Sequence, residues 1–201
     1  MTVYVGLARA VNLGGETTVR MADLARVVEA AGGQAPRPWL RSGNVVFEAS
    51  PQPTDAIERR LEERGAAVLG RAPEFFVRSA ATWATIVRGN PFPDAARSDP
   101  AHLTVMVLKE EPAPTAWRRL EDAIVGRERA VGRDRHAYLV YPDGIGRSRL
   151  TASVVERALG TRGTLRNWNT VTALARLAAA PERGHAPSSE RSRRAATSAG
   201  P

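Results

Sequence analysis

The sequence predicts an α+β protein, in which a ferredoxin-like N-terminal lobe of order βαββαβ precedes a second, smaller α+β lobe that ends in two helices. Three observations lead to this prediction. Short runs rich in valine and leucine indicate buried strands, and segments with apolar residues at helical spacing separate them. The first six segments follow the order β-α-β-β-α-β. A polar, proline-rich stretch at residues 88–100 then divides the chain.

The first half of the N-terminal lobe begins with a strand expected at residues 2–11. A turn containing Gly14 and Gly15 leads to a helix, because apolar residues from 21 to 31 recur at helical spacing. Two strands, at residues 38–40 and 45–47, flank a tight turn or bulge.

The second half of this lobe contains a helix after Pro53, which we expect Gly65 to end, and a strand at residues 74–78. Short right-handed crossovers on one antiparallel sheet make the arrangement ferredoxin-like, with two helices over one face. Ser79 is expected to cap a further helix.

The second lobe begins with an apolar strand at residues 102–109, followed by a helix after Pro114. Two strands come next, at residues 128–131 and 137–141, and then two helices, which we expect at 150–159 and from about Thr170. No internal repeat is visible beyond a loose similarity in the order of helices and strands.

The domain boundaries follow from these segments: one lobe at residues 1–90 and another at 91–180. Residues 181–201 have no apolar face, and we expect them to form a disordered basic tail.

The composition excludes several classes of protein. The chain has no cysteine, which excludes disulfides, thiolate nucleophiles and cysteine-ligated zinc. Its N-terminus does not read as a signal peptide, and no apolar run is long enough to span a bilayer. We therefore expect a cytoplasmic protein without membrane partners.

The net charge is +8 with a pI of about 11.1, which raises the question of nucleic-acid binding. All basic residues except Lys109 are arginine, a skew that looks like coding bias. Acidic residues are interleaved with them, as is usual on a solvated helix face.

Motifs for catalysis and for phosphate or metal binding are absent. The chain has no P-loop and no GxSxG sequence, and its three histidines lack metal-ligand spacing. A Ser148–His136–Asp143 triad would have to be assembled from distant segments, so we do not favour it. The sequence therefore implies no metal and no cofactor.

Four sequence motifs together resemble a known family. These are GLARAVNLGG with VRMADL, the hairpin SGNVVF, the connector GNPFP, and YPDGIGRSRLT with LGTRGTLRNWNTVTAL. In this order they are similar to the bacterial family known as domain of unknown function 1697, over about residues 3–178. The resemblance implies a two-lobed α+β fold whose first lobe is ferredoxin-like, and it implies no activity.

Polar residues in the second lobe are the first candidates for a ligand site. Arg147 and Ser148 follow a glycine-rich turn whose backbone N–H groups are suited to bind an anion, although Ser148 or Thr151 could equally cap the next helix.

Three residues that follow have the same ambiguity. Arg166 is suited to grip a phosphate or carboxylate, and Trp168 to stack on a ring. Alternatively, Trp168 packs into the core, Asn167 binds loop carbonyls, and Asn169 caps the last helix.

The first lobe offers four comparable residues. Arg9 lies in an apolar strand and needs an acid or a ligand as partner, and Asn12 follows in the glycine-rich turn. Arg41 and Asn44 lie at the hairpin. We expect these residues to share a cleft with the arginine-rich turn of the second lobe.

The leading hypothesis is therefore a binding module for an anionic ligand, a nucleotide or nucleic acid, held between the two lobes. The alternative is an enzyme without a covalent nucleophile, in which Arg41, Arg147 and Arg166 clamp the substrate and Asp143 moves protons. A protein-interaction module is the third hypothesis.

Overall fold

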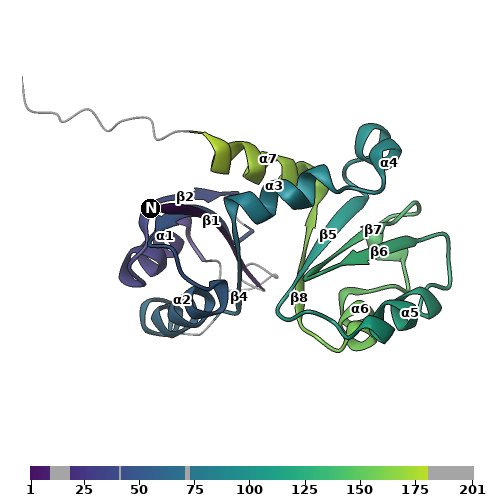
Figure 1. Cartoon of the computed structure of the whole chain (residues 1–201), viewed down its shortest axis with the longest axis horizontal. Coiled ribbons are helices and arrows are strands. Elements are labelled where there is room, and N and C mark those ends of the chain that lie inside the picture. Colours follow the sequence, from purple (N-terminus) through teal and green to yellow (C-terminus); the bar gives the residue numbers. More distant parts are fainter. Residues whose placement is uncertain (10–18, 41, 71–72, 181–201) are drawn as a thin grey trace, which may run out of the picture.

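A computed structural model describes residues 1–9, 19–40, 42–70 and 73–180 (Figure 1). Within these residues the chain forms two four-stranded antiparallel sheets with helices packed on them. The predicted turn at residues 12–15 and the predicted tail at 181–201 lie outside the described residues.

The first sheet and its helices come from the N-terminal half of the chain. Its strands take the order β2-β3-β1-β4, and every neighbouring pair is antiparallel. The elements are β1 (Thr2–Ala8), α1 (Met21–Ala30), β2 (Gln34–Trp39), β3 (Asn44–Ala49), α2 (Thr54–Leu69), β4 (Phe75–Ser79) and α3 (Ala80–Arg88).

The second sheet has the strand order β6-β7-β5-β8, again with antiparallel neighbours. A short helix, α4 (Pro93–Ser98), precedes it within the predicted connector. The remaining elements are β5 (Leu103–Leu108), α5 (Pro114–Asp122), β6 (Arg129–Arg133), β7 (His136–Val140), the 3-10 helix η1 (Ile145–Arg147), α6 (Ala152–Leu159), β8 (Gly163–Asn167) and α7 (Trp168–Ala179).

The two halves repeat one topology, β-α-β-β-α-β-α, which the sequence did not reveal. In the first half Tyr4 pairs with Ser79, and in the second half Thr104 pairs with Asn167. Each of these last strand residues caps the helix that follows, since Ser79 accepts a hydrogen bond from the backbone N–H of Thr82 and Asn167 from that of Thr170. The predicted cap Ser79 is thus confirmed.

Three details of the sequence prediction were wrong. The cap of the last helix is Asn167 and not Asn169, because the chain from Gly163 to Asn167 forms β8, which was predicted as a loop. Helix α2 continues through Gly65 and ends at Leu69, where Gly70 takes the left-handed conformation that favours glycine. The lobe boundaries at residues 90 and 180 stay predictions.

Three apolar cores hold these layers together. One core lies between the first sheet and α1 and α2, and another between the second sheet and α5 and α6. The third joins the inner faces of both sheets to α3 and α7, which lie side by side between them (Figure 1). At their contact the indole N–H of Trp83 donates to the carbonyl oxygen of Val171, 3.0 Å away. These are the fourth residues of α3 and α7, so the two halves meet about a pseudo-two-fold axis.

The alternation of side chains along the central strands explains why the sheets are covered on both faces. In β1, Val5 and Leu7 belong to the core between the halves, whereas Tyr4 faces α1 and α2. In β5, Val105 faces the same central core and Met106 the core under α5 and α6. Burying each such side chain contributes about 1.5–3 kcal/mol.

In the part of the chain that the structure describes, no helix is long and apolar enough to cross a membrane.

Candidate ligand-binding site

Two arginines in equivalent positions reach across from one half to the other. Arg78 and Arg166 each precede the residue that caps the helix after the last strand. The Nη2 of Arg78 donates to the carbonyl oxygens of Leu108 (2.5 Å) and Arg135 (3.1 Å). Both acceptors belong to the second half, so Arg78 ties β4 to the far half of the molecule.

Arg166 makes the reciprocal contacts. Its Nη2 donates to the carbonyl oxygens of Ala8 (3.1 Å) and Ser42 (3.0 Å) in the first half. Ala8 and Leu108 occupy equivalent places at the ends of β1 and β5. We refer to these places as the Arg78 corner (Arg78, Leu108, Arg135 and His136) and the Arg166 corner (Arg166, Ala8, Ser42 and Asn44).

A buried carboxylate lies next to the Arg78 corner. Glu58, only 1% exposed, accepts a hydrogen bond of 2.7 Å from the backbone N–H of Val77. Three cations surround it: Lys109 at 3.1 Å, Arg78 at 3.6 Å and Arg135 at 3.8 Å. These cations and the N–H group compensate the Glu58 carboxylate for the water that it loses on burial.

One further acid completes this cluster. The Nζ of Lys109 lies 2.6 Å from Glu62, and it also donates to the carbonyl oxygen of Phe75. The cluster therefore contains three cations, Arg78, Lys109 and Arg135, and two carboxylates, Glu58 and Glu62. One positive charge remains in excess.

The pKa values of this cluster reflect its burial. Burial lowers the pKa of Arg78 to about 10; the charge of Arg135 adds to this effect, and that of Glu58 opposes it. Burial also acts to lower the pKa of Lys109, but hydrogen bonds and charges from Glu62 and Glu58 outweigh it and raise that pKa. Arg78 and Lys109 therefore stay charged at neutral pH.

A cavity of about 300 Å³ opens at the Arg78 corner. Residues of both halves line it, with three threonines, two arginines, two acids, one histidine and one isoleucine among them. They are Thr54, Arg78, Thr82, Thr85, Ile86, Glu111, Asp134, Arg135 and His136. Its volume is at the lower end of the range of small-molecule sites.

His136, the first residue of β7, is 6% exposed and forms part of this wall. Its Nε2 lies 3.2 Å from the hydroxyl of Tyr138, which in turn donates to the carbonyl oxygen of Ile86 at 2.6 Å. Burial is the main cause that lowers the pKa of His136 to about 4, so the ring is neutral at physiological pH.

Three of the residues predicted from the sequence meet between the halves. Arg9 forms an ion pair of 2.5 Å with Glu156 of α6 and lies 3.5 Å from Glu74. Arg9 was expected to need an acid or a ligand as partner, and the structure provides an acid from within the protein. The Nε of Arg166 donates to Oδ1 of Asn44 at 2.6 Å.

The hydrogen bonds of Arg166 account for all five of its N–H groups. Besides its bonds to Asn44, Ala8 and Ser42, its Nη1 donates to the hydroxyl of Thr164 and the carbonyl oxygen of Leu165. Every acceptor is neutral, and burial lowers the pKa of Arg166 to about 10. Asn44 is likewise occupied, because its amide donates to Trp39 and Ser42.

The residues that follow Arg166 have structural positions. Asn167 caps α7, and Trp168 lies in the core between the two halves. These are the packing and capping roles that the sequence allowed, although Asn167 takes the place expected for Asn169.

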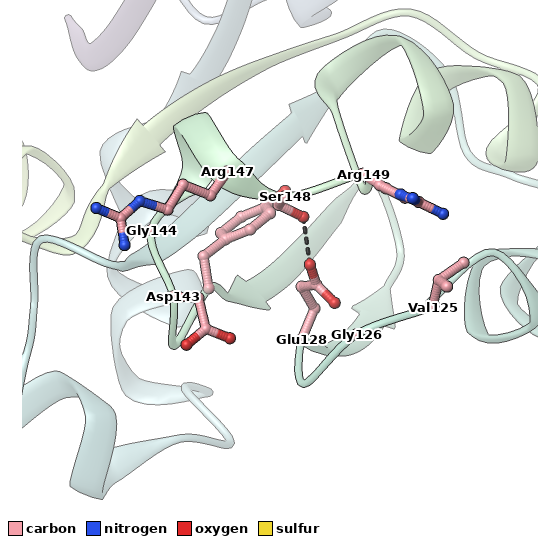
Figure 2. A pocket seen from close by; sticks show the side chains of 9 residues that line it. Val125, Gly126, Glu128, Asp143, Gly144, Arg147, Ser148 and Arg149 are labelled. Atoms are coloured by element: carbon pink, nitrogen blue, oxygen red, sulfur yellow. Dashed lines mark hydrogen bonds between the residues drawn. The ribbon is translucent and has the colours of Figure 1, made fainter.

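Arg147 and Ser148 lie away from the contact between the halves, at another cavity of about 280 Å³ (Figure 2). Ser148 donates a hydrogen bond to Glu128 and accepts one from the backbone N–H of Leu150. The side chains of Arg147 and Arg149 point to opposite sides of the Ser148–Glu128 pair (Figure 2). Thr151, the alternative to Ser148, caps α6.

The acid expected near these residues is already paired. Oδ2 of Asp143 accepts a hydrogen bond of 3.0 Å from Nε of Arg127, a contact that lowers the pKa of Asp143. Ser148 and Asp143 line the outer cavity, whereas His136 lines the one between the halves. The structure therefore does not bring a Ser–His–Asp triad together.

Two predicted site residues, Asn12 and Arg41, lie outside the described residues. Among the residues that are described, no group of three His, Asp or Glu side chains is arranged to hold a metal ion.

Arg78 and Arg135, which line the cavity between the halves, were not predicted as site residues, and His136 was considered only as part of a triad that we did not favour. A signal for Arg78 was present, since it stands alone in the apolar segment FFVRS just as Arg9 does in its strand. For Arg135 and His136 no local signal distinguishes them from an ordinary hairpin.

Comparison with known proteins supports the fold. The family described as "Protein of unknown function (DUF1697)" matches residues 1–138. No curated protein matches the chain. A solved structure, that of the conserved bacterial protein SP0830 from Streptococcus pneumoniae, is similar with a TM-score of 0.68 and 17% identity, over 88% of this chain and 98% of that one. At this identity the similarity shows the fold alone.

Proposed function

Since the chain belongs to the DUF1697 family, whose description assigns no activity, we propose its function from its site: the protein binds a small anionic ligand in the cavity at the Arg78 corner. The observation that carries this proposal is the pair of arginines in the cavity wall, Arg78 and Arg135, which share the single buried carboxylate Glu58. An anion in the cavity would be attracted to these two guanidinium groups.

The cavity wall also offers donors for an anion. Nη1 of Arg135 makes only a long contact of 3.5 Å, to the hydroxyl of Thr54. Thr82, whose hydroxyl lies 2.9 Å from Oγ of Ser79, lines the same cavity from α3, whereas the hydroxyl of Thr85 donates to the carbonyl oxygen of Ala81. Phosphate and carboxylate oxygens accept hydrogen bonds from arginine and threonine in this manner.

The size of the cavity favours a small ligand over a nucleic acid. A space of about 300 Å³ holds a metabolite, whereas a polymer needs an extended basic groove. A nucleic-acid partner would instead use exposed arginines such as Arg147 and Arg149, and its affinity would fall steeply with salt.

The enzyme hypothesis has less support. The arginines proposed to clamp a substrate include Arg147 at the outer cavity and Arg166 at the contact between the halves, and Asp143 is paired with Arg127. These groups do not surround one position where a substrate could react.

The proposal is tested by measuring the melting temperature in the presence of inorganic phosphate, pyrophosphate and small carboxylates. A ligand at one hundred times its Kd stabilises the folded state by about 2.7 kcal/mol. We expect the Arg135→Gln and Thr82→Val variants to lose most of the ligand-induced rise. Arg118→Gln, which removes an exposed charge from α5, should keep it. A rise that is equal in all four proteins, or absent from the wild type, would contradict the proposal.

A further inference from the structure

We infer that the anionic ligand carries a hydrogen-bond donor, a hydroxyl or an N–H group close to its charged end, which binds Nδ1 of His136. The inference rests on the function proposed above and defines the ligand class: hydroxylated or amino-substituted phosphates and carboxylates. It follows from the hydrogen bonds around the His136 ring.

The hydrogen bonds fix the tautomer of His136. A tyrosine hydroxyl has one proton, and Tyr138 must donate it to the carbonyl oxygen of Ile86, since a carbonyl only accepts. The Tyr138 oxygen therefore accepts from His136, so the proton of the neutral ring resides on Nε2. Nδ1 is left as a lone-pair acceptor.

No group in the described part of the chain hydrogen-bonds to this Nδ1 atom. His136 is 6% exposed and lines the cavity. Its Nδ1 has no partner and yet is not one of the fully buried polar atoms of the described residues, so it is accessible from the cavity. A ligand that fills the cavity without offering a donor would strip water from Nδ1 and leave it unpaired, which is unfavourable.

The charges near His136 favour a ligand with two different ends. Arg78 and Arg135 lie toward the buried cluster, whereas Asp134 is exposed and lies on the same hairpin. Glu111, also exposed, adds a second acid to the lining. An anionic group on the arginine side and a hydroxyl or amine toward His136 and the acids match this distribution.

The experiment uses pairs of probes that differ in one donor: 2-hydroxypropyl phosphate against propyl phosphate, and lactate against propionate. Their affinities for the full chain are measured by calorimetry. We expect the hydroxylated probe to bind roughly fivefold to tenfold more tightly in at least one pair. Nitrogen NMR of the labelled histidine rings should show a shift at Nδ1 of His136 with that probe and not with its matched partner.

Two variants separate recognition from folding. His136→Gln keeps a donor for Tyr138 but has no acceptor at the position of Nδ1, because its amide oxygen lies elsewhere, so the two probes should then bind about equally. Tyr138→Phe removes the group that fixes the tautomer and should weaken the preference while His136 remains. The NMR measurement on the wild type stands by itself if a variant does not fold.

The outcomes distinguish the two proposals. If both members of each pair bind equally and Nδ1 of His136 does not respond, the donor inference is overturned while anion binding stands. If no probe binds at any concentration, the proposed function fails, and the donor inference fails with it.

Discussion

The Arg78 corner and the Arg166 corner occupy equivalent places in a repeated topology, yet one opens onto a cavity and the other is filled by its own hydrogen bonds. His136 and Asn44 begin the equivalent strands β7 and β3. Asn44 accepts a hydrogen bond from Arg166, and the described residues thereby occupy all five N–H groups of that arginine. His136 makes no such bond to Arg78, and the cavity lies there instead. The side chain at the strand start is thus one difference between the two corners.

The two corners also differ in charge. Glu62 and Glu156 are equivalent, because each accepts a hydrogen bond from the N–H group of the first residue in the last strand, Phe75 or Gly163. One turn earlier, α2 provides Glu58, whereas the corresponding residue of α6 is Ala152. The longer helix therefore supplies an acid for Arg78 that the shorter helix does not supply for Arg166.

The largest expected effect comes from removing that acid. Glu58→Gln leaves Arg78, Lys109 and Arg135 without their shared carboxylate, and should lower the free energy of unfolding by about 3–5 kcal/mol. Urea denaturation measures the loss, and Glu63→Gln on the exposed side of α2 serves as the control. A loss below about 1 kcal/mol would show that the three cations do not depend on Glu58.

The next effect tests the histidine that has no counterpart in the Arg166 corner. Because the pKa of His136 falls from 6.5 to about 4 on folding, the unfolded chain binds more protons between these values. The contribution of neutral His136 to the free energy of unfolding is therefore fully present above pH 6.5. It is lost as the pH falls toward 4, which lowers the free energy of unfolding by up to about 3 kcal/mol. Unfolding measured across this range should be less pH-dependent in His136→Gln. If the pH dependence of unfolding were the same in His136→Gln as in the wild type, the lowered pKa of His136 would be refuted.

Arg166→Lys tests whether the closed corner depends on hydrogen bonds or on charge. A lysine keeps the positive charge but cannot serve five acceptors in a fixed plane, so we expect a loss of about 1–3 kcal/mol. Chemical denaturation is the measurement, with Arg176→Lys on α7 as the control. Full stability in Arg166→Lys would mean that charge alone holds this corner together.

The smallest effect should be equal in the two halves. Ser79→Ala and Asn167→Ala each remove a helix cap at the same place in the topology, and each should cost about 1 kcal/mol in unfolding free energy. Thermal and urea unfolding of both variants give the comparison. If only one of the two variants lost stability, the halves would be equivalent in backbone topology but not in the energy of their helix caps.

Much of this fold could be predicted because its signals are local. Alternation along β1 and β5 and the helical spacing around Trp83 and Leu120 reflect which face of each element is buried. Strand β8 escaped prediction because GTLRN lacks an apolar run, and its last residue, Asn167, was expected to bind loop carbonyls. Tertiary pairing with β5, not local preference, makes it a strand.

The candidate site was less predictable for a physical reason. Arg78 and Leu108 are 30 residues apart, and Lys109 and Glu62 are 47 apart, so their contacts depend on how the halves pack. Arg166 bonds to Asn44 and to the carbonyl oxygen of Ala8, the residue before Arg9, but no pattern in the sequence shows that these hydrogen bonds are satisfied within the protein. The role of Arg9, Asn44 and Arg166 toward a ligand stays a prediction.

The contact between Trp83 and Val171, equivalent residues that meet at the pseudo-two-fold axis, has a consequence for how such a protein can specialise. Two identical subunits arranged about this axis would form a homodimer in which every substitution occurs twice. Both corners would then have to be open or closed together. Joining the two copies in one chain removes that constraint. The Arg166 corner can then hold the two halves together by its hydrogen bonds, while the Arg78 corner is free to acquire a ligand.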